Sequence, residues 1–343
     1  MIASVKPSPP SPSPSSIPLK LRIFYVILNL LLSLTARFAK RRDGSFNRAV
    51  FAFLDVRAPP SPARGPDGVA TSDHVVDPAR DLSVRYFSPA DRPGPPLPVV
   101  VYFHGGGFVS GSARSPAFDA FCRRLCRALP AHVLSVEYRL APEHRFPAPL
   151  DDGADVLRWL DSGAHGLRGI EDQPAVFVAG DSAGGNIAHH VARRASAEAY
   201  GRIRVAGLVS IQPFLGGEAD TESERALPFV SRGHLKWIWR SFLPPGSDCD
   251  HEAANVFGPG SSSSGGGDWS GFPAAMVVVG GLDSLQDRQR CYYQGLKRMG
   301  VQACLKEYPN GVHSFHVFPE FPEAQQLIHD VGEFVQRHSQ INK

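Results

Sequence analysis

The sequence is poor in the residues that mark several classes of protein. Only five of its 343 residues are cysteine, and they follow no regular spacing. No histidine or second cysteine pair completes a zinc ligand set around them, so we expect no metal site. An odd number of scattered cysteines also argues against a disulfide framework. We therefore expect reduced thiols and an intracellular protein, in the cytoplasm with a nuclear location left open.

Charge of either sign is also in short supply. The 36 Lys and Arg residues nearly balance the 33 Asp and Glu residues, and the formal net charge is +3. No basic run is interleaved with aromatic residues, so we expect no nucleic-acid partner. The chain also lacks the phosphate-binding patterns G-x-G-x-x-G and G-K-[ST]. We expect no nucleotide cofactor, and no other cofactor is indicated.

An uninterrupted apolar run of the roughly 20 residues that a membrane span needs is missing as well. Residues 1–16 form a Pro/Ser tract that we expect to be disordered. The apolar segment Ile17–Ala39 is interrupted by Arg22 and Asn29. We favour a helix packed on the protein, with membrane association as the main alternative and a signal peptide as a third. Residues 17–67 are thus predicted to form helices, including one over Phe46–Leu54, and a Pro-rich linker.

The stretch Val176–His190 indicates a catalytic turn. The apolar run Val176–Ala179 has the composition of a buried strand, and Asn186–Ala192 is typical of a helix. Between them, Gly180-Asp181-Ser182-Ala183-Gly184 matches G-x-S-x-G, the pattern of a serine nucleophile elbow. Glycines flank the serine because side chains there would collide with neighbouring backbone. Ser182 is therefore the candidate nucleophile.

Apolar strands alternate with helices over most of the chain from residue 68 to 343. Expected strands lie at Leu82–Phe87 (a half-buried edge strand), Val99–Phe103, His132–Val136, Val176–Ala179, Val205–Ile211, Met276–Val279 and Ala303–Tyr308. Expected helices lie at Ala117–Leu129, after Asp151 or Asp152, after the serine turn, and at Glu323–Gln336. This alternation predicts an α/β domain with a mostly parallel central sheet covered by helices on both faces.

The alternation stops at about residues 213–272. The segment Leu227–Leu243 predicts an inserted helix, and Ser261–Gly267 predicts a flexible loop. Such an insertion would lie above the carboxyl ends of the strands, where open α/β sheets bind ligands. We expect it to cap a pocket together with the amino-terminal helices.

Two further residues complete a candidate catalytic set. A serine hydroxyl needs a base to take its proton and a carboxylate to orient that base. Asp283 follows the strand Met276–Val279 and is preferred to Asp287 as the acid. His313 follows the last strand and is preferred to His316 as the base.

Glycines after the second strand supply candidate donors for the negative charge that develops on a carbonyl oxygen. The sequence His104-Gly105-Gly106-Gly107-Phe108 follows Val99–Phe103. Backbone N–H groups approach an oxyanion best where no Cβ intervenes. We predict an oxyanion hole made by Gly105, Gly106 and Gly107, completed by Ala183 directly after the nucleophile.

The sequence resembles the hormone-sensitive-lipase branch of the α/β-hydrolases, and within it the plant carboxylesterases. The similarity extends from about residue 17 to the end of the chain and is most specific in H-G-G-G-F (104–108), Y-R-L-A-P-E-H-R (138–145), G-D-S-A-G-G-N-I-A-H-H (180–190), Q-P-F-L-G-G (212–217) and V-V-V-G-G-L-D (277–283). The resemblance implies the α/β-hydrolase fold, the triad Ser182, Asp283 and His313, and the oxyanion hole named above.

The amino terminus, with R-R-D-G-S-F-N-R (41–48) and F-L-D (53–55), is similar to the subgroup that contains the gibberellin receptors. In those proteins the corresponding helices close as a lid over the hormone, and the catalytic histidine is lost. This chain keeps His313, and Gly107 stands where the receptors carry serine. Leu235 and Ile238 align with a polar arginine and tyrosine of the receptor pocket. The provisional substrate pocket comprises Phe108, Phe214, Leu235 and Ile238.

Together these features predict a serine carboxylesterase for small to medium hydrophobic esters, acting through an acyl-enzyme. The alternative is a gibberellin-receptor-like sensor whose lid closes over a small molecule and recruits a protein partner. The identity of that partner is not indicated by the sequence.

Overall fold

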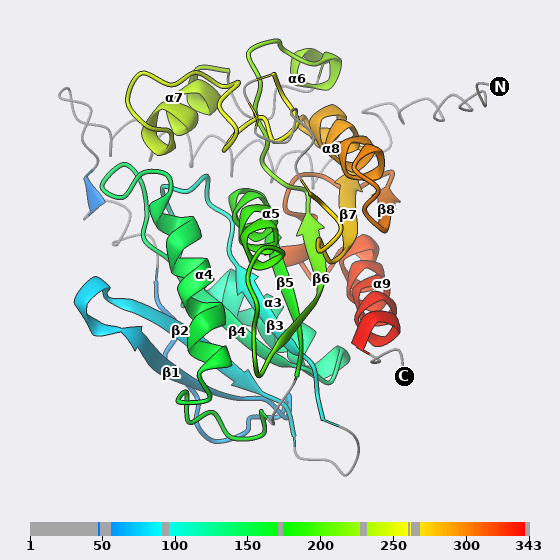
Figure 1. Ribbon diagram of the computed structural model, residues 1–343. Coiled ribbons are helices and arrows are strands. Elements are labelled where there is room, and N and C mark those ends of the chain that lie inside the picture. Colours follow the sequence, from blue (N-terminus) through cyan, green and yellow to red (C-terminus); the bar gives the residue numbers. More distant parts are fainter. Residues whose placement is uncertain are drawn as a thin grey trace.

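Eight strands form a single sheet in the order β1-β2-β4-β3-β5-β6-β7-β8 (Figure 1). The computed structural model describes residues 47–48, 56–90, 96–170, 174–226, 232–259, 261 and 268–339. The strands are β1 (Ala70–Asp77), β2 (Leu82–Ser88), β3 (Val99–Phe103), β4 (His132–Glu137), β5 (Ala175–Asp181), β6 (Arg204–Ile211), β7 (Ala274–Gly280) and β8 (Ala303–Tyr308).

The sheet is mostly parallel. Strand β2 pairs antiparallel with both β1 and β4, whereas all pairs from β4 to β8 are parallel. The carboxyl ends of the parallel strands therefore meet at one edge, which is where open α/β sheets place their ligand sites. The predicted α/β-hydrolase architecture is confirmed.

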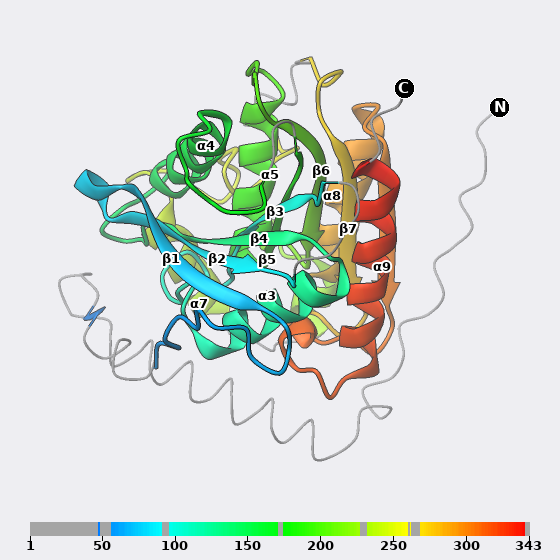
Figure 2. The same ribbon diagram turned by 90° about the horizontal axis from the view of Figure 1, so that it is seen from below.

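Helices cover both faces, as continuous apolar strands require. One face carries α4 (Ala148–Asp161), α5 (Ala183–Ala195) and α8 (Gln286–Arg298), and the other carries α3 (Pro116–Ala128) and α9 (Pro322–Ser339). Alternate residues of one strand serve the two faces: Val99 and Val101 pack in the first core, and Val100 and Tyr102 in the second. Figure 2 shows α4 and α5 on one side of the strands and α3 on the other.

Two helices interrupt the alternation between β6 and β7. They are α6 (Glu222–Ala226) and α7 (Arg232–Phe242), and they lie beyond the carboxyl ends of the strands (Figure 1). Ile238 of α7 reaches the glycine loop after β3, because a Cβ added to Gly107 would lie 3.0 Å from its Cδ1. The predicted helix Leu227–Leu243 thus appears as α7, with residues 227–231 outside the described part.

The interpretation of Leu82–Phe87 as a half-buried edge strand is wrong. Strand β1 pairs with β2 on its outer side, so β2 is not an edge strand, and residues 82–87 are all buried because their side chains pack into the cores on the two faces. Strand β1 itself was not predicted, since its sequence A-T-S-D-H-V-V-D is largely polar and partly exposed. The helix expected to begin at Asp151 or Asp152 begins at Ala148.

The predictions for the Pro/Ser tract and for the apolar segment Ile17–Ala39 lie outside the described residues, as does most of the segment Phe46–Leu54. Within the described residues, no helix has the length and apolar character to cross a membrane. All five cysteines are free thiols, with Cys122 and Cys126 buried in the core beneath α3.

Candidate active site

Ser182 lies on a strained turn between β5 and α5. Its backbone has φ 52° and ψ −119°, outside the regions that non-glycine residues ordinarily adopt. The flanking glycines are required by close backbone approach. A Cβ on Gly184 would lie 1.9 Å from the carbonyl oxygen of Phe103, and a Cβ on Gly180 would lie 2.3 Å from the carbonyl oxygen of Gly184.

The structure brings Ser182, His313 and Asp283 together from three segments of the chain. His313 Nε2 lies 3.0 Å from Ser182 Oγ, although the two residues are 131 positions apart. Its other ring nitrogen, Nδ1, lies 2.8 Å from Asp283 Oδ2. With Nδ1 protonated and bonded to the carboxylate, Nε2 is free to accept the serine proton.

Three N–H groups orient the Asp283 carboxylate, which is fully buried. The backbone N–H of Leu285 donates to Oδ1 at 2.9 Å. The side-chain amides of Gln289 and Gln212 donate to Oδ2 at 2.8 and 3.0 Å. Oδ2 is also the atom that accepts from His313 Nδ1. The position of the carboxylate therefore fixes the orientation of the imidazole.

Electrostatics at His313 favour its protonated form. Burial lowers the pKa of His313, but the charge and hydrogen bond of Asp283, together with the charge of Asp181, outweigh burial and raise that pKa overall. An imidazole with two carboxylates nearby is a stronger base toward the Ser182 hydroxyl.

The glycine loop after β3 supplies a cradle of backbone amides. Gly106 and Gly107 adopt φ +117° and +63°, which favour glycine. The carbonyl oxygen of Gly106 accepts hydrogen bonds from the N–H groups of Val109 and Ser110, so it turns away from the amide cradle. Ala183 opens α5, where the first N–H groups of a helix have no partner within the helix.

Gly105 differs from its two neighbours. Its N–H already donates to Asp181 Oδ1 at 2.8 Å. The side chain of Asp181 is buried and comes from the end of β5. This bond withdraws the Gly105 amide from the predicted donor set. The amides available to an oxyanion are therefore those of Gly106, Gly107 and Ala183.

Asp181 is a buried carboxylate directly before Ser182. It also accepts the hydroxyl of Tyr102 at 2.5 Å. Burial raises the pKa of Asp181 to about 6, against the opposing effects of Tyr102, His313 and the Gly105 amide. Sequence reasoning assigned it no role, although a carboxylate at the end of an apolar strand was a signal that could have marked it.

The rejected alternatives lie elsewhere. Asp287 Oδ2 accepts the backbone N–H of Ser223 at the start of α6. His316 is completely buried, with its Nε2 at 3.6 Å from Asp181 Oδ2. Neither residue takes the place of Asp283 or His313 beside Ser182.

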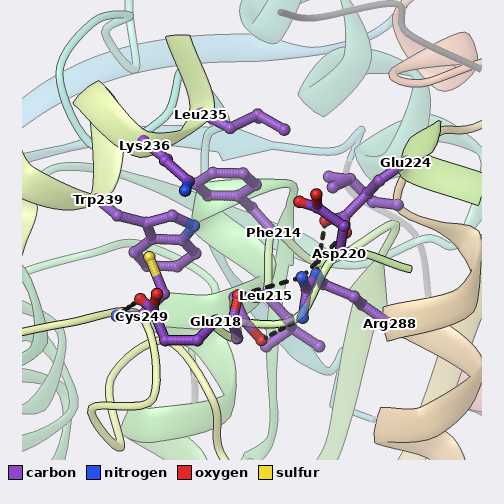
Figure 3. Close-up of a pocket in the computed structure, with 13 residues that line it drawn as sticks. Phe214, Leu215, Glu218, Asp220, Glu224, Leu235, Lys236, Trp239, Cys249 and Arg288 are labelled. Atoms are coloured by element: carbon purple, nitrogen blue, oxygen red, sulfur yellow. Dashed lines mark hydrogen bonds and ion pairs between the residues drawn. The ribbon is translucent and has the colours of Figure 1, made fainter. Parts of the chain in front are cut away.

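Of the four provisional pocket residues, Phe214 and Leu235 line a small pocket, and Phe108 and Ile238 do not. Phe108 is fully buried and stacks on Phe242 with ring centroids 3.7 Å apart, so it supports the pocket from behind rather than facing a ligand. Ile238 covers Gly107. Phe214, whose N–H donates to the carbonyl oxygen of Ser182, and Leu235 line a small pocket under α7 (Figure 3).

The pocket in Figure 3 combines an aromatic wall with a charged one. Phe214 stacks on Trp239 at 4.4 Å between ring centroids, and Leu235 lies above them. On the opposite side, Arg288 of α8 binds Glu224 of α6 at 2.6 Å. The pocket holds about 40 Å³, which is room for a few water molecules.

No cluster of three or more His, Cys, Asp or Glu side chains suited to a metal ion occurs among the residues that the structure describes.

Gln212, which binds Asp283, was also overlooked at the sequence level. Its signal was the motif Q-P-F-L-G-G, to which no chemistry was attached.

Comparison with known proteins agrees with this geometry. Residues 100–317 match the family described as alpha/beta hydrolase fold. The chain is 40% identical to the gibberellin receptor GID1B of Arabidopsis thaliana over 315 residues, 86% of each chain. It is 33% identical to probable carboxylesterase 8 of the same plant, covering 77% of this chain and 84% of that one.

Among solved structures, an esterase of Pyrobaculum calidifontis superposes with a TM-score of 0.67 at 27% identity, covering 94% of both chains. The matched region contains the elbow, the glycine loop and the strand ends that carry Asp283 and His313. The chain therefore belongs to the α/β-hydrolase family, in its hormone-sensitive-lipase-like branch, where its relatives include plant carboxylesterases and gibberellin receptors.

Proposed function

We propose that the protein is a serine carboxylesterase that hydrolyses small to medium hydrophobic esters without a cofactor. The observation that carries the proposal is the continuous hydrogen-bonded line from Ser182 Oγ through both nitrogens of His313 to Asp283. At the serine end of this line, the strained backbone of Ser182 lies beside backbone amides that have no hydrogen-bond partner among the described residues. Acyl transfer requires this arrangement.

In the first half-reaction, Ser182 Oγ attacks the carbonyl carbon of the ester while His313 Nε2 takes the hydroxyl proton. The new C–O bond places negative charge on the carbonyl oxygen, which the N–H groups of Gly106, Gly107 and Ala183 stabilise. Each such donor contributes about 3–4 kcal/mol to transition-state stabilisation. The bond to the leaving oxygen then breaks, and His313 returns its proton to the departing alcohol.

In the second half-reaction, water attacks the acyl-serine and gives a proton to His313 Nε2. Collapse of the tetrahedral intermediate breaks the bond to Ser182 Oγ, which regains the proton from His313. The carboxylic acid leaves, and the triad returns to its starting state. Asp283, bonded to His313 Nδ1, stabilises the imidazolium in both halves.

The test replaces Ser182 with alanine and follows hydrolysis of p-nitrophenyl esters of graded chain length. Ser182→Ala should reduce turnover by at least about 10³-fold, because the nucleophile is lost. The matched control is Ser196→Ala at the far end of α5, which should keep wild-type rates. Equal rates for Ser182→Ala and the wild type would refute the assignment. A fluorophosphonate should also label the wild type at Ser182.

We further propose that residues 17–67 form a lid over this site. Support comes from Arg48, whose guanidinium donates to Glu143 Oε1 at 3.1 Å and to the carbonyl oxygens of Val109 and Ala141. These contacts fasten Arg48 to Val109, which follows the glycine loop, and to the loop after β4 that contains Ala141 and Glu143. Fractionation of cells expressing the full chain tests the competing membrane anchor, since a lid predicts recovery in the soluble fraction.

The second candidate function is small-molecule sensing with recruitment of a protein partner. It is favoured by the similarity to gibberellin receptors over 86% of this chain. The test is calorimetric titration of a gibberellin into Ser182→Ala, beside ester turnover by the wild type. Tight gibberellin binding together with negligible ester hydrolysis would favour sensing, and the converse result favours catalysis.

A further inference from the structure

Gln212 occupies an unusual position immediately after β6. Its side chain is buried, with 1% of the residue exposed, and its backbone adopts φ +43°. The backbone N–H donates to the carbonyl oxygen of Val278 at 3.0 Å, which carries the β6–β7 pairing one residue past the strand end. A non-glycine residue held in this region costs free energy, so the surrounding contacts must compensate.

The amide of Gln212 makes three hydrogen bonds, all of them to the acid–base pair or its immediate neighbours. Its Nε2 donates to Asp283 Oδ2 at 3.0 Å and to the carbonyl oxygen of Val312 at 3.1 Å. Its Oε1 accepts the backbone N–H of Ser314 at 2.9 Å. One side chain therefore contacts the carboxylate and both residues that flank His313.

Two glycines make room for this arrangement. A Cβ on Gly280 would lie 2.5 Å from Gln212 Nε2 and 2.4 Å from the carbonyl oxygen of Gly311. A Cβ on Gly281 would lie 2.5 Å from the carbonyl oxygen of Pro309. The motifs Q-P-F-L-G-G and V-V-V-G-G-L-D thus meet at one point, where the loop at residues 309–314 packs directly against the end of β7.

We infer that Gln212 is a positioning residue that sets the distance and orientation between Asp283 and His313 by tying the histidine loop to the carboxylate. This inference rests on the proposed function, because it concerns the same Ser182 site. Without the amide, the half-buried N–H of Ser314 and the buried carbonyl oxygen of Val312 would lose this partner, and the loop would shift to find other partners.

The chain offers a matched control in Gln289. Its Nε2 also donates to Asp283 Oδ2, at 2.8 Å, but within the described residues no hydrogen bond joins its side chain to the backbone at residues 312 or 314. Gln212→Met and Gln289→Met therefore remove the same kind of donor from Asp283. Only the first substitution also releases the loop that carries His313.

The experiment compares kcat and KM of both variants on p-nitrophenyl esters. Gln212→Met should lower kcat on the order of 10²-fold with little change in KM, because a displacement of about 1 Å at a reacting group costs this much. Gln289→Met should lower kcat by much less. Equal kcat losses in two folded variants, or no loss in Gln212→Met, would overturn the inference.

A second readout does not depend on ester turnover. Hydrogen exchange should be slow at Ser314 in the wild type and in Gln289→Met, and faster in Gln212→Met, because that amide loses its acceptor. If the wild type hydrolyses no ester, the proposed function fails, yet the exchange comparison still decides whether Gln212 holds the loop. Unchanged exchange at residues 312–314 in Gln212→Met would count against the inference.

Gln212→Glu covers the case in which the methionine variant does not fold. The glutamate side chain has the same shape and still accepts from Ser314. In its ionised form it can donate to neither Asp283 nor Val312, and in its neutral form its single O–H can donate to only one of them. We expect a kcat below that of Gln289→Met with near-normal packing. A kcat equal to that of the wild type would contradict the role given to the Gln212 donors.

Discussion

Asp181 Oδ1 lies 2.8 Å from the backbone nitrogen of Gly105, so the residue before Ser182 binds the first glycine of the glycine loop. The bond joins the end of β5 to the loop after β3. Since Ser182 follows Asp181 and Gly106 follows Gly105, this hydrogen bond helps to set the spacing between Ser182 and the amide cradle. The same carboxylate also contributes charge that favours protonated His313.

Asp181→Asn should separate these two effects. The asparagine Oδ1 can still accept from Gly105 and Tyr102, whereas the negative charge is lost. The titratable groups facing His313 are then Asp283 and His316, and the pKa of His313 should fall because one anionic neighbour is gone. Since the base must be neutral, the acidic limb of the kcat/KM profile should move to lower pH.

The measurement is the pH dependence of kcat/KM for wild type and Asp181→Asn on one ester. Asp287→Asn serves as the control, because it removes a carboxylate that binds the backbone of Ser223 and does not face His313. An acidic limb that stays in place in Asp181→Asn would show that the charge of Asp181 does not reach His313.

His316 should make stability depend on pH. It is fully buried between Phe121 and Phe315, and among the described residues neither ring nitrogen has a hydrogen-bond partner. Burial, with smaller effects from His313 and Arg124, lowers the pKa of His316 to about 3. In the unfolded chain His316 is protonated below about pH 6.5, whereas in the folded chain it stays neutral until the pH falls to about 3. Stability is therefore complete above pH 6.5 and is lost as the pH falls.

Replacing this imidazole by a phenyl ring should flatten that dependence. Between pH 7 and pH 5, we expect the free energy of unfolding to fall less in His316→Phe than in the wild type. The difference between the two slopes should be at most about 1.4 kcal/mol per pH unit. Urea denaturation at the two pH values provides the comparison. Parallel losses in the wild type and the variant would exclude His316 as a source of acid sensitivity.

The ion pair between α6 and α8 should be important for stability. Arg288 binds Glu224 and also donates to the carbonyl oxygens of Gly216, Gly217 and Ala219, and the two side chains are only 12% and 7% exposed. Arg288→Met leaves a buried carboxylate without its partner. The free energy of unfolding should fall by about 3–5 kcal/mol.

Denaturant titration measures this loss, and Arg290→Met on the same helix is the control. Arg290 pairs with Glu307 at a more exposed position, so its removal should cost about 1 kcal/mol or less. Similar losses of unfolding free energy in Arg288→Met and Arg290→Met would mean that burial of the Arg288–Glu224 pair does not increase its contribution to stability.

The fold was largely predictable because the strands are continuous apolar runs and the turns carry glycine where backbone approach demands it. Val99–Phe103 is both the predicted and the observed strand, and Gly180 and Gly184 meet the close contacts expected of the elbow. Strand β1 escaped notice because a partly exposed outer strand needs no apolar run. Because β1 pairs with it, β2 is an inner strand of the sheet rather than an edge strand.

The juxtaposition of Ser182, Asp283 and His313 was likewise predictable from chain order, since each follows a parallel strand and such ends meet at one edge. The roles of Gly105 and Gln212 were not predictable. Which amide faces the cradle, and which side chain holds the loop, depend on distances of a few tenths of an ångström between segments remote in sequence. Spacing along the chain carries no information at that scale.

The wide separation of the triad along the chain has a consequence for synthesis. Ser182 and His313 are 131 positions apart, and the loop that carries His313 follows the last strand, β8. A nascent chain that has already formed the elbow and the glycine loop still lacks the proposed base. Under the proposed function, synthesis must therefore pass residue 313 before the first ester bond can be cleaved.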